Sequence, residues 1–243
     1  MSGFMNWTPL RGGIVKIGNP IDKDSRVYRG VFDGKEVAVK SVLDTNEKEC
    51  DILRNLTHEN IIKYKYMVQE GRTLHIVLEL CSHSLEQYVL QEDHCNISLT
   101  SIEVLKQITE GVYYLHNGQT YCTVHCDLKP SNVLFLYVER DARWLVKISD
   151  FGLSKDLSPD KSSTTSHVKG SHGYIAPELL VRKDGTKGPG KIRKETDMFS
   201  LGVIFYFTLS GGKHPFSNDP YYANAKVRDA EPSLSELGEE CEL

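Results

Sequence analysis

The chain contains a short loop with three functional polar groups, followed within one hairpin's length by an acidic turn. The loop runs from His125 to Asn132 and includes Asp127 and Lys129, and the turn begins at Asp150. Phosphoryl transfer needs a group that orients a hydroxyl, a cation for the moving phosphate, and oxygen ligands for magnesium. A polar turn with capping residues is the alternative interpretation. Motifs later in the chain follow this loop in a consistent order, which favours phosphoryl transfer over a purely structural turn.

The segments around this loop place strands first and helices later. Hairpins are expected over 14–43, turning at Asp33-Gly34, and a further strand over Thr73 to Glu79. Apolar residues on one face predict helices over 45–56 and 99–116, and a stretch that is apolar almost all round predicts a buried helix over 196–209. Shorter strands are expected over 133–135 and 146–148, and loops over 155–169 and 182–194. This order predicts an α+β protein.

Composition and charge indicate the cellular compartment of the chain and the kinds of partner it does not attract. The 243 residues are 40% hydrophobic, with a net charge of −4 and six scattered cysteines without a C-x-x-C pair. These values indicate reduced thiols and no general attraction to nucleic acid. The longest apolar run, Leu201 to Leu209, is too short to span a bilayer, and the start has no secretion signal. We expect a cytoplasmic protein without direct membrane insertion, or the cytosolic face of a membrane protein if the chain is a fragment.

A lysine ends one of the hydrophobic strands. In Val37 to Lys40 the ammonium of Lys40 comes at the strand's end, where it can bridge two nucleotide phosphates. Glu49 on the next helix is the carboxylate expected to hold it. A lysine on a strand is by itself usually just solvated, so this interpretation depends on the polar loop.

Together these motifs resemble the eukaryotic protein kinase domain of the serine/threonine type, from about residue 14 to 226. Ala176-Pro177-Glu178 and Asp197 to Gly202 follow the polar loop in the family's order. The resemblance implies an α+β, bilobal, protein-kinase-like fold: a five-stranded antiparallel N-lobe sheet with an αC helix, and a mainly helical, truncated C-lobe. The expected divisions are an N-terminal extension (1–13), N-lobe (14–80), C-lobe (81–226, ending after the αF/αG region) and acidic tail (227–243).

The resemblance also assigns roles, with ATP and Mg²⁺ as cofactors. The expected catalytic residues are Asp127, Lys129, Lys40 and Glu49. The expected nucleotide-binding residues are Gly18, Val27, Ala38, Lys40, Leu78, Glu79, Cys81 and Leu134. The expected magnesium ligands are Asn132 and Asp150. Leu53, His125 and Phe151 would stack as a regulatory spine, and Asp197 would anchor the backbone of the polar loop.

Several segments are similar to one group within this family, the inositol-requiring kinase/endoribonucleases of the unfolded-protein response and the 2-5A-dependent ribonucleases. They are Leu78 to Cys81, Ile148 to Lys155, Tyr174 to Glu178 and Gly211 to Phe216. A ribonuclease domain follows the kinase domain in that group and is absent from this sequence, so we expect no nuclease activity. The resemblance implies a protein substrate and suggests a homodimer. RNA binding is not expected, because no aromatic residues interleave with the basic residues of 182–194.

Three features depart from the family pattern. The stretch from Gly18 to Val27 has one glycine, and its Asp22 and Asp24 would repel phosphate, so weaker ATP binding is expected. Cys126 replaces the usual arginine that binds a phosphate, so phosphorylation within Ser162 to Ser166 should change activity little. Glu178 would lack its arginine partner from later helices, leaving a buried unpaired charge.

The leading interpretation is an ATP- and magnesium-dependent serine/threonine protein kinase of the unfolded-protein-response sensor type, able to phosphorylate itself. The alternative is a pseudokinase-like nucleotide-binding scaffold, or a fragment of a longer kinase/endoribonuclease.

Overall fold

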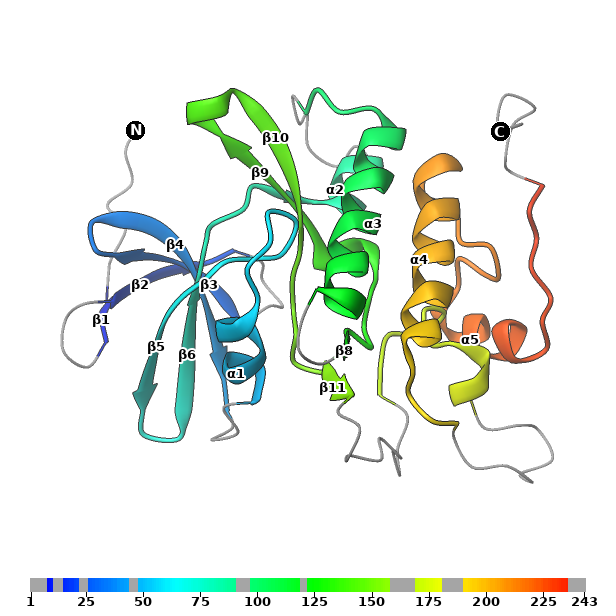
Figure 1. Ribbon diagram of the computed structural model, residues 1–243, viewed down its shortest axis with the longest axis horizontal. Coiled ribbons are helices and arrows are strands. Elements are labelled where there is room, and N and C mark those ends of the chain that lie inside the picture. Colours follow the sequence, from blue (N-terminus) through cyan, green and yellow to red (C-terminus); the bar gives the residue numbers. More distant parts are fainter. Residues whose placement is uncertain are drawn as a thin grey trace. The chain divides into compact units, whose positions relative to one another are not determined.

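The computed structural model describes residues 8–10, 15–21, 26–43, 48–90, 97–118, 122–157, 169–180 and 190–235 (Figure 1). The chain forms two compact units. The N-terminal unit comprises Met1–Thr57 and Ile61–Ser82, and the C-terminal unit comprises His58–Asn60 and His83–Leu243. The first unit is mostly sheet and the second contains most of the helices, which confirms the predicted α+β class.

The N-terminal unit contains one antiparallel sheet with the order β1-β2-β3-β4-β6-β5. Its strands are β1 (Thr8–Pro9), β2 (Val15–Pro20), β3 (Val27–Phe32), β4 (Lys35–Val42), β5 (Tyr64–Glu70) and β6 (Thr73–Leu78). The predicted five-stranded sheet corresponds to β2 through β6. The two-residue strand β1 pairs with β2 at the sheet edge and makes the sixth strand.

The turn between β3 and β4 shows why the hairpin was predictable. Asp33 and Gly34 both have positive φ, 51° and 71°. A two-residue hairpin loop with this geometry matches the twist of the flanking strands, and Asp-Gly is among the sequences that adopt it readily. The predicted turn is confirmed.

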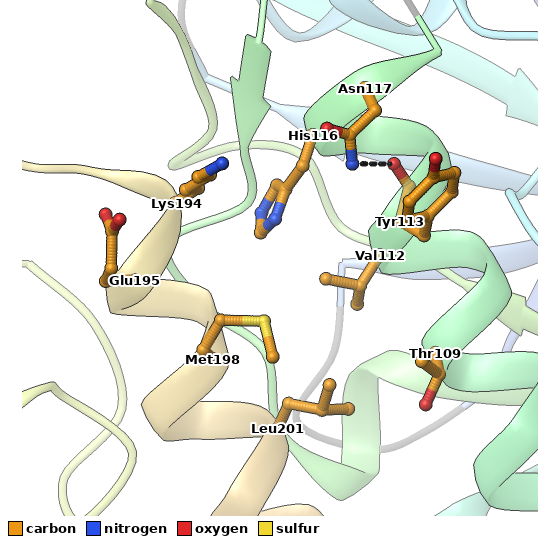
Figure 2. Close-up of a pocket in the computed structure, with 9 residues that line it drawn as sticks. All are labelled: Thr109, Val112, Tyr113, His116, Asn117, Lys194, Glu195, Met198 and Leu201. Carbon is orange, nitrogen blue, oxygen red and sulfur yellow. Dashed lines mark hydrogen bonds between the residues drawn. The ribbon is translucent and has the colours of Figure 1, made fainter.

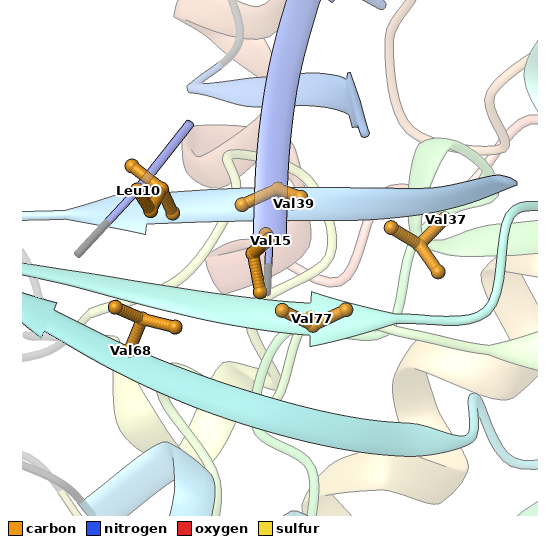
Figure 3. Close-up of a cluster of buried hydrophobic side chains, with 6 residues drawn as sticks. All are labelled: Leu10, Val15, Val37, Val39, Val68 and Val77. Atoms are coloured by element: carbon orange, nitrogen blue, oxygen red, sulfur yellow. The ribbon is translucent and has the colours of Figure 1, made fainter. Parts of the chain in front are cut away.

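The two faces of β4 have different surroundings. Val37 and Val39 point into a cluster of buried apolar side chains (Figure 3). The other members of that cluster are Leu10, Val15, Val68 and Val77. Because side chains alternate along a strand, Ala38 and Lys40 lie on the opposite face of β4.

The helix α1 (Lys48–Asn55) belongs to the same unit and buries Cys50, Ile52 and Leu53. The prediction began this helix at residue 45, but residues 44–47 lie outside the described part. Its first turn carries Glu49 and Asp51, which favour a helix N-terminus through the macrodipole.

The C-terminal unit combines helices with short strands. The helices are α2 (Leu85–Leu90), α3 (Ser101–Asn117), α4 (Lys194–Leu209) and α5 (Pro220–Arg228). The strands are β7 (His83–Ser84), β8 (Cys122–Val124), β9 (Val133–Val138), β10 (Arg143–Ile148) and β11 (Lys155–Leu157). One sheet has the order β10-β9-β7, and β11 pairs with β8. α3 and α4 lie side by side (Figure 1).

The long helix α3 begins at a capping box. The Thr100 hydroxyl accepts a hydrogen bond from the Glu103 N–H at 3.2 Å, and the Glu103 carboxylate accepts one from the Thr100 N–H at 2.8 Å. These two bonds satisfy donors that a helix N-terminus leaves unpaired. The inner face of α3 is buried through Val104, Leu105, Ile108, Val112 and Leu115. The predicted helix is confirmed within two residues at each end.

Some elements differ from the predictions. α2 and α5 were not predicted, and β11 occupies the start of the segment expected to be a loop. α5 buries only Ala223 and Val227, so it has almost no apolar periodicity. Its sequence signal is local: Asp219 caps it by accepting from the Tyr221 N–H at 2.9 Å, and Pro220 occupies the first turn. In the expected acidic tail, residues 229–235 form no helix or strand, and residues 236–243 lie outside the described part.

A short insert from between two segments of the N-terminal unit belongs to the C-terminal unit. The Asn60 side chain donates to Val146 O at 2.9 Å and to Gln107 Oε1 at 3.0 Å, and Asn60 O accepts from Ile148 N–H at 2.9 Å. The His58 ring stacks on Tyr114 with centroids 4.7 Å apart. The insert is thus tied to both α3 and β10. Among the described helices, none combines the length and hydropathy needed to cross a bilayer.

Candidate active site

The polar loop follows β8 and ends in the 3₁₀ turn Pro130–Asn132, which leads directly into β9. β9 and β10 pair in register from Val133↔Ile148 to Val138↔Arg143, so the chain returns to the loop at Ser149. The Asn132 carbonyl accepts from both the N–H and the hydroxyl of Ser149 at 2.9 Å. The β9–β10 hairpin therefore brings Asp150 next to the polar loop, as the spacing of the two motifs suggested.

A buried carboxylate on α4 holds the backbone at the start of the loop. Asp197 is fully buried and accepts hydrogen bonds from the N–H groups of His125 at 2.8 Å and Cys126 at 2.9 Å. The Nε2 atom of His116 lies 2.8 Å from the same carboxylate. The expected anchoring by Asp197 is confirmed, and α3 contributes a third partner that was not expected.

This anchoring holds a backbone conformation that Cys126 does not favour by itself. Cys126 has φ of 67°, and Asp150 has φ of 65°. A left-handed conformation costs a non-glycine residue about 1 to 2 kcal/mol. Residues in such conformations persist where surrounding contacts determine them, and they concentrate at functional sites. In this protein Cys126 and Asp150 both lie beside the polar groups of the loop.

The carboxylate of Asp127 is oriented by donors from three directions. Ser171 N–H donates to Oδ1 at 2.9 Å, Asn132 Nδ2 donates to Oδ2 at 3.2 Å, and Lys129 Nζ lies 3.4 Å from Oδ2. Lys129 also donates to the Ser171 hydroxyl at 2.7 Å. The ammonium of Lys129 and the carboxylate of Asp127 are therefore held beside one serine, the first at its hydroxyl and the second at its N–H. The side chains of Asp127 and Lys129 remain 11% and 27% exposed, so the pair is shielded but accessible.

Asn132 and Asp150 provide the oxygen donors that magnesium prefers. The Asn132 amide nitrogen makes both of its hydrogen bonds to Asp127, at 2.8 Å to the carbonyl and 3.2 Å to the carboxylate. This orientation makes the amide oxygen the atom for a cation. Magnesium usually takes one or two protein ligands besides phosphate and water. The two residues fit that requirement, and the described residues contain no cluster of three or more His, Cys, Asp or Glu suited to a metal.

In the N-terminal unit, Lys40 and Glu49 form the predicted ion pair. Lys40 Nζ lies 2.7 Å from Oε1 and 2.9 Å from Oε2 of Glu49. The two side chains are 17% and 11% exposed, so the pair is partly shielded from solvent. β4 supplies the lysine and the first turn of α1 supplies the carboxylate.

Four of the expected nucleotide-binding residues share one face of the N-terminal sheet. Lys40 pairs with Val27 across β3–β4, and Ala38 pairs with Leu78 across β4–β6. Directly opposed residues point to the same face, and Ala38 and Lys40 are two positions apart on one strand. This face is opposite to the apolar cluster of Figure 3.

The other expected nucleotide-binding residues lie in separate places. Gly18 lies where the β2–β3 register shifts between Ile17 and Pro20. The Glu79 N–H donates to Lys63 O at 3.0 Å, so a nucleotide contact by Glu79 would have to use its carbonyl. Cys81 lies in the stretch after β6 and is half-buried, and Leu134 is half-buried on β9 in the other unit. Asp22 and Asp24 lie outside the described residues.

Two members of the expected spine are in contact. The rings of His125 and Phe151 meet edge to face with centroids 4.9 Å apart, and both are buried. His125 Nε2 lies 2.9 Å from Ser149 O, which fixes the ring. Leu53, the third expected member, is buried in the N-terminal unit.

The segment 169–180 is fixed to the C-terminal unit by several contacts. Gly173 N–H donates to Asn224 Oδ1 at 2.7 Å, and the Ser200 hydroxyl donates to Tyr174 O at 2.7 Å. Gly173 has φ of 83°, and a Cβ there would lie 2.6 Å from Nε2 of His214. Burial raises the pKa of the Tyr174 hydroxyl and lowers the pKa of His214. Burial therefore favours the neutral form of both side chains.

One expectation about this segment is wrong. Glu178 was expected to be buried and unpaired, but it is exposed. The 3₁₀ turn Pro177–Leu179 buries Leu179 instead, and the Glu178 carbonyl accepts from Gly190 N–H at 2.9 Å. The carboxylate therefore carries no desolvation penalty. Ser162 to Ser166 lie outside the described residues.

Sequence reasoning missed Ser171 and His116. Ser171 contacts both Asp127 and Lys129, yet it is one of many serines and lies more than forty positions from either. His116 occupies a regular position in the last turn of α3, where a histidine is unremarkable. The only signal for Ser171 was its proximity to Ala176-Pro177-Glu178.

The order and geometry of these elements agree with a known family. The family model described as "Protein kinase domain" matches residues 22–238. The chain belongs to the protein kinase family. By the resemblance to that family, the polar loop is expected to be its catalytic loop, and residues 169–180 the end of its activation segment. The predicted kinase fold is confirmed at the level of the family.

Named relatives show which group within the kinase family this chain is similar to. The serine/threonine-protein kinase/endoribonuclease ire-1 of Caenorhabditis elegans is 38% identical over 223 residues, covering 88% of this chain and 22% of the relative. The human IRE2 protein of the same description is 36% identical over 222 residues, covering 88% and 23%. The sensor for unfolded proteins in the ER, ire1, of Schizosaccharomyces pombe is 37% identical over 218 residues, covering 79% and 20%. The chain spans about a fifth of the length of these relatives. The predicted similarity to the kinase/endoribonuclease group is confirmed.

Proposed function

We propose that this chain is an ATP- and magnesium-dependent serine/threonine protein kinase that transfers phosphate to protein hydroxyls, including its own. Membership of the kinase family and the names of its relatives support this assignment. The observation that carries it is the position of Asp127 and Lys129 beside one serine, since the Asp127 carboxylate accepts from the Ser171 N–H and Lys129 donates to the Ser171 hydroxyl.

The proposed roles follow from the contacts. Asp127 orients a substrate hydroxyl and accepts its proton, since its carboxylate is held in place by Ser171 and Asn132. Lys129 places a positive charge where the moving phosphate develops negative charge. Lys40, fixed by Glu49, contacts the nucleotide phosphates. Val27, Ala38 and Leu78, on the same sheet face as Lys40, provide the apolar surface for adenine.

Asn132 and Asp150 would hold the magnesium. When bound, the ion supplies charge neutralisation on the phosphates. The chain's own contribution is to orient the two ligands: Asp127 holds the Asn132 amide, and the β9–β10 hairpin positions Asp150.

The decisive experiment is autophosphorylation with labelled ATP, comparing the wild type with Asp127→Ala. The loss of an oriented base should lower the rate by several orders of magnitude, about 4 kcal/mol or more in activation free energy. Asp156→Ala is a matched control, because that exposed carboxylate binds only Thr123, at 2.6 Å, among the described residues. Equal, low incorporation in the wild type and Asp127→Ala would reject the enzyme.

A second function is favoured by one observation, the irregular pairing of β2 with β3. The register shifts between Ile17 and Pro20, and Pro20 has no N–H to offer a phosphate. A chain with such an irregular strand pairing can serve as a nucleotide-binding scaffold without catalysis. Calorimetry with ATP and magnesium separates the two: we expect a Kd weaker than about 10 μM, near −7 kcal/mol. Binding without measurable phosphate transfer would favour the scaffold.

The biological setting is proposed from the relatives. Their names describe kinase/endoribonucleases and a sensor for unfolded proteins in the ER. We infer that this kinase domain acts in an unfolded-protein response and faces the cytosol. Its protein substrate and its self-association remain predictions. Whether phosphorylation within Ser162 to Ser166 changes activity can be measured by phosphatase treatment, and a large loss of activity would refute the predicted insensitivity.

A further inference from the structure

A groove lies between α3 and α4 in the C-terminal unit, outside the cluster of polar groups proposed for phosphate transfer. Its volume is about 270 Å³, and Figure 2 shows side chains of both helices around it. A dry apolar cavity of about 150 Å³ is enough to bind a benzene ring. The groove therefore has room for an aromatic molecule with two fused rings.

The lining of the groove is apolar on both sides. Val112 from α3 and Leu201 from α4 are buried, at 2% and 4% exposed, and form its inner part. Tyr113 and Met198 are 69% and 50% exposed and form its outer part, one on each helix (Figure 2). Aromatic rings and thioethers both make favourable contacts with an aromatic ring. This lining suits a flat apolar guest.

One buried polar side chain interrupts the apolar lining. The ring of His116 lines the groove (Figure 2), and its side chain is only 5% exposed. Its Nε2 atom lies 2.8 Å from the Asp197 carboxylate, which can only accept, so Nε2 carries the proton. In the neutral ring Nδ1 is then an acceptor, and among the described residues it has no hydrogen-bond partner. A buried acceptor in this state favours a guest that brings a donor.

The other polar groups of the lining do not select a charged guest. Lys194 and Glu195, in the first turn of α4, are both exposed and carry opposite charges. Thr109 and Asn117 donate to backbone carbonyls of α3, at 2.8 Å and 3.0 Å. With one cation and one anion at its edge, the groove offers no net charge to attract an anionic or a cationic molecule.

We propose that the α3–α4 groove is a binding site for a neutral aromatic molecule with an N–H or O–H donor, of the size of indole. The ring system lies between Val112 and Tyr113 on one side and Met198 and Leu201 on the other. The donor forms a hydrogen bond to Nδ1 of His116. This site does not depend on the proposed kinase activity.

A guest in the groove is connected to the polar loop by a short chain of hydrogen bonds. His116 binds Asp197, and Asp197 accepts from the N–H groups of His125 at 2.8 Å and Cys126 at 2.9 Å. Hydrogen bonds in a chain polarise one another, so a donor on Nδ1 strengthens the bond from Nε2 to the carboxylate. Occupancy of the groove should therefore slow the opening of the loop backbone.

Indole and 1-methylindole test the site, because they differ in the N–H donor. NMR titration of the intact chain should give a Kd of about 1 mM for indole. The Kd of 1-methylindole should be at least about fivefold weaker, since one hydrogen bond is lost. Indole should shift the Nδ1 resonance of His116, and it should slow amide exchange at His125 and Cys126 at least about twofold. Equal affinities, or an indole Kd weaker than about 10 mM, would overturn the proposal, and unchanged exchange at saturation would overturn its link to the loop.

Variants locate the binding within the groove. Met198→Glu places a carboxylate in the groove and should abolish indole binding, whereas Ile102→Glu should leave the Kd unchanged. Ile102 is a matched control because it is 60% exposed on α3 but does not line the groove. Both positions are exposed, so thermal melting should show that the variants fold. Binding that survives Met198→Glu, or that Ile102→Glu abolishes, would place the guest elsewhere and refute the site.

Charged relatives of indole test the expected neutrality of the guest. Indole-3-acetate and tryptamine carry a negative and a positive charge on the same ring system. Neither should bind more than about threefold tighter than indole, because the charges of Lys194 and Glu195 offset each other. A stronger preference for either ion would refute the assignment of a neutral ligand.

Discussion

Replacing Asp197 by alanine should loosen the catalytic loop without touching any group proposed to contact substrate. The carboxylate is fully buried and serves the N–H groups of His125 and Cys126 and the ring of His116. Each buried polar group left without a partner costs about 1 to 3 kcal/mol. Three such groups give an expected loss of at least about 3 kcal/mol. This is a large part of the 5 to 15 kcal/mol that holds a typical domain folded.

The effect should be local as well as global. Because Cys126 keeps its left-handed φ of 67° under these hydrogen bonds, its amide should exchange with solvent much faster in the variant. Amide hydrogen exchange at His125 and Cys126 is the primary measurement, and urea unfolding gives the overall loss. A chain of two compact units need not unfold in one step, so the residue-level measurement is the stricter one.

Asp197→Asn and Asp156→Ala complete the design. Asparagine keeps the shape but offers one acceptor oxygen where two are used, so an intermediate loss is expected. Asp156 is exposed and accepts a hydrogen bond of 2.6 Å from the buried Thr123 hydroxyl, so its loss should leave one buried group unpaired, where Asp197→Ala leaves three, and should cost about 1 to 3 kcal/mol. If Asp197→Ala lost less than about 1 kcal/mol and left both amides protected, the anchoring role would be refuted.

Three further predictions can be checked on the same protein. Gly173→Ala should lose about 2 to 4 kcal/mol in urea unfolding, since it combines φ of 83° with a Cβ 2.6 Å from His214, and an unchanged midpoint would contradict this. Lys40→Ala should weaken ATP binding at least about tenfold by calorimetry, and equal affinity would exclude its phosphate contact. His214 has a lowered pKa through burial, so the unfolded chain takes up its proton first as the pH falls through about 6.5. Stability should therefore fall below that pH, and His214→Gln should reduce the slope of the urea midpoint between about pH 7 and pH 5.

Local signals explain which parts of the fold could be predicted. The Asp33-Gly34 turn needs two residues with positive φ, and α3 needs an apolar stripe and a cap, so both can be identified within a few neighbouring residues. α5 has a cap and a proline but buries only two side chains, so no periodic pattern revealed it. The two-residue strand β1 is defined by its pairing with β2 alone.

The contacts in the candidate site also divide into local ones, which the sequence predicts, and long-range ones, which it does not. Asp127, Lys129 and Asn132 lie within six positions, and their mutual contacts follow from one loop. The contact of Ser171 with Lys129 joins residues 42 positions apart, and no composition or spacing indicates such a contact. Glu178 shows the converse error: its motif was identified correctly, but its exposure depends on how the Pro177–Leu179 turn directs its neighbours.

The three-residue insert His58–Asn60 has a practical consequence for dividing the protein. Cutting the chain after Ser82 would give a C-terminal fragment without Asn60, whose side chain and carbonyl serve Val146, Gln107 and Ile148. A recombinant fragment beginning at His83 would therefore leave the groups of β10 and α3 that bind Asn60 without this hydrogen-bond partner. Limited proteolysis at that point should instead yield two pieces that elute together, because the first piece keeps the insert that the second requires. The two units are interleaved along the sequence, so one boundary cannot separate them.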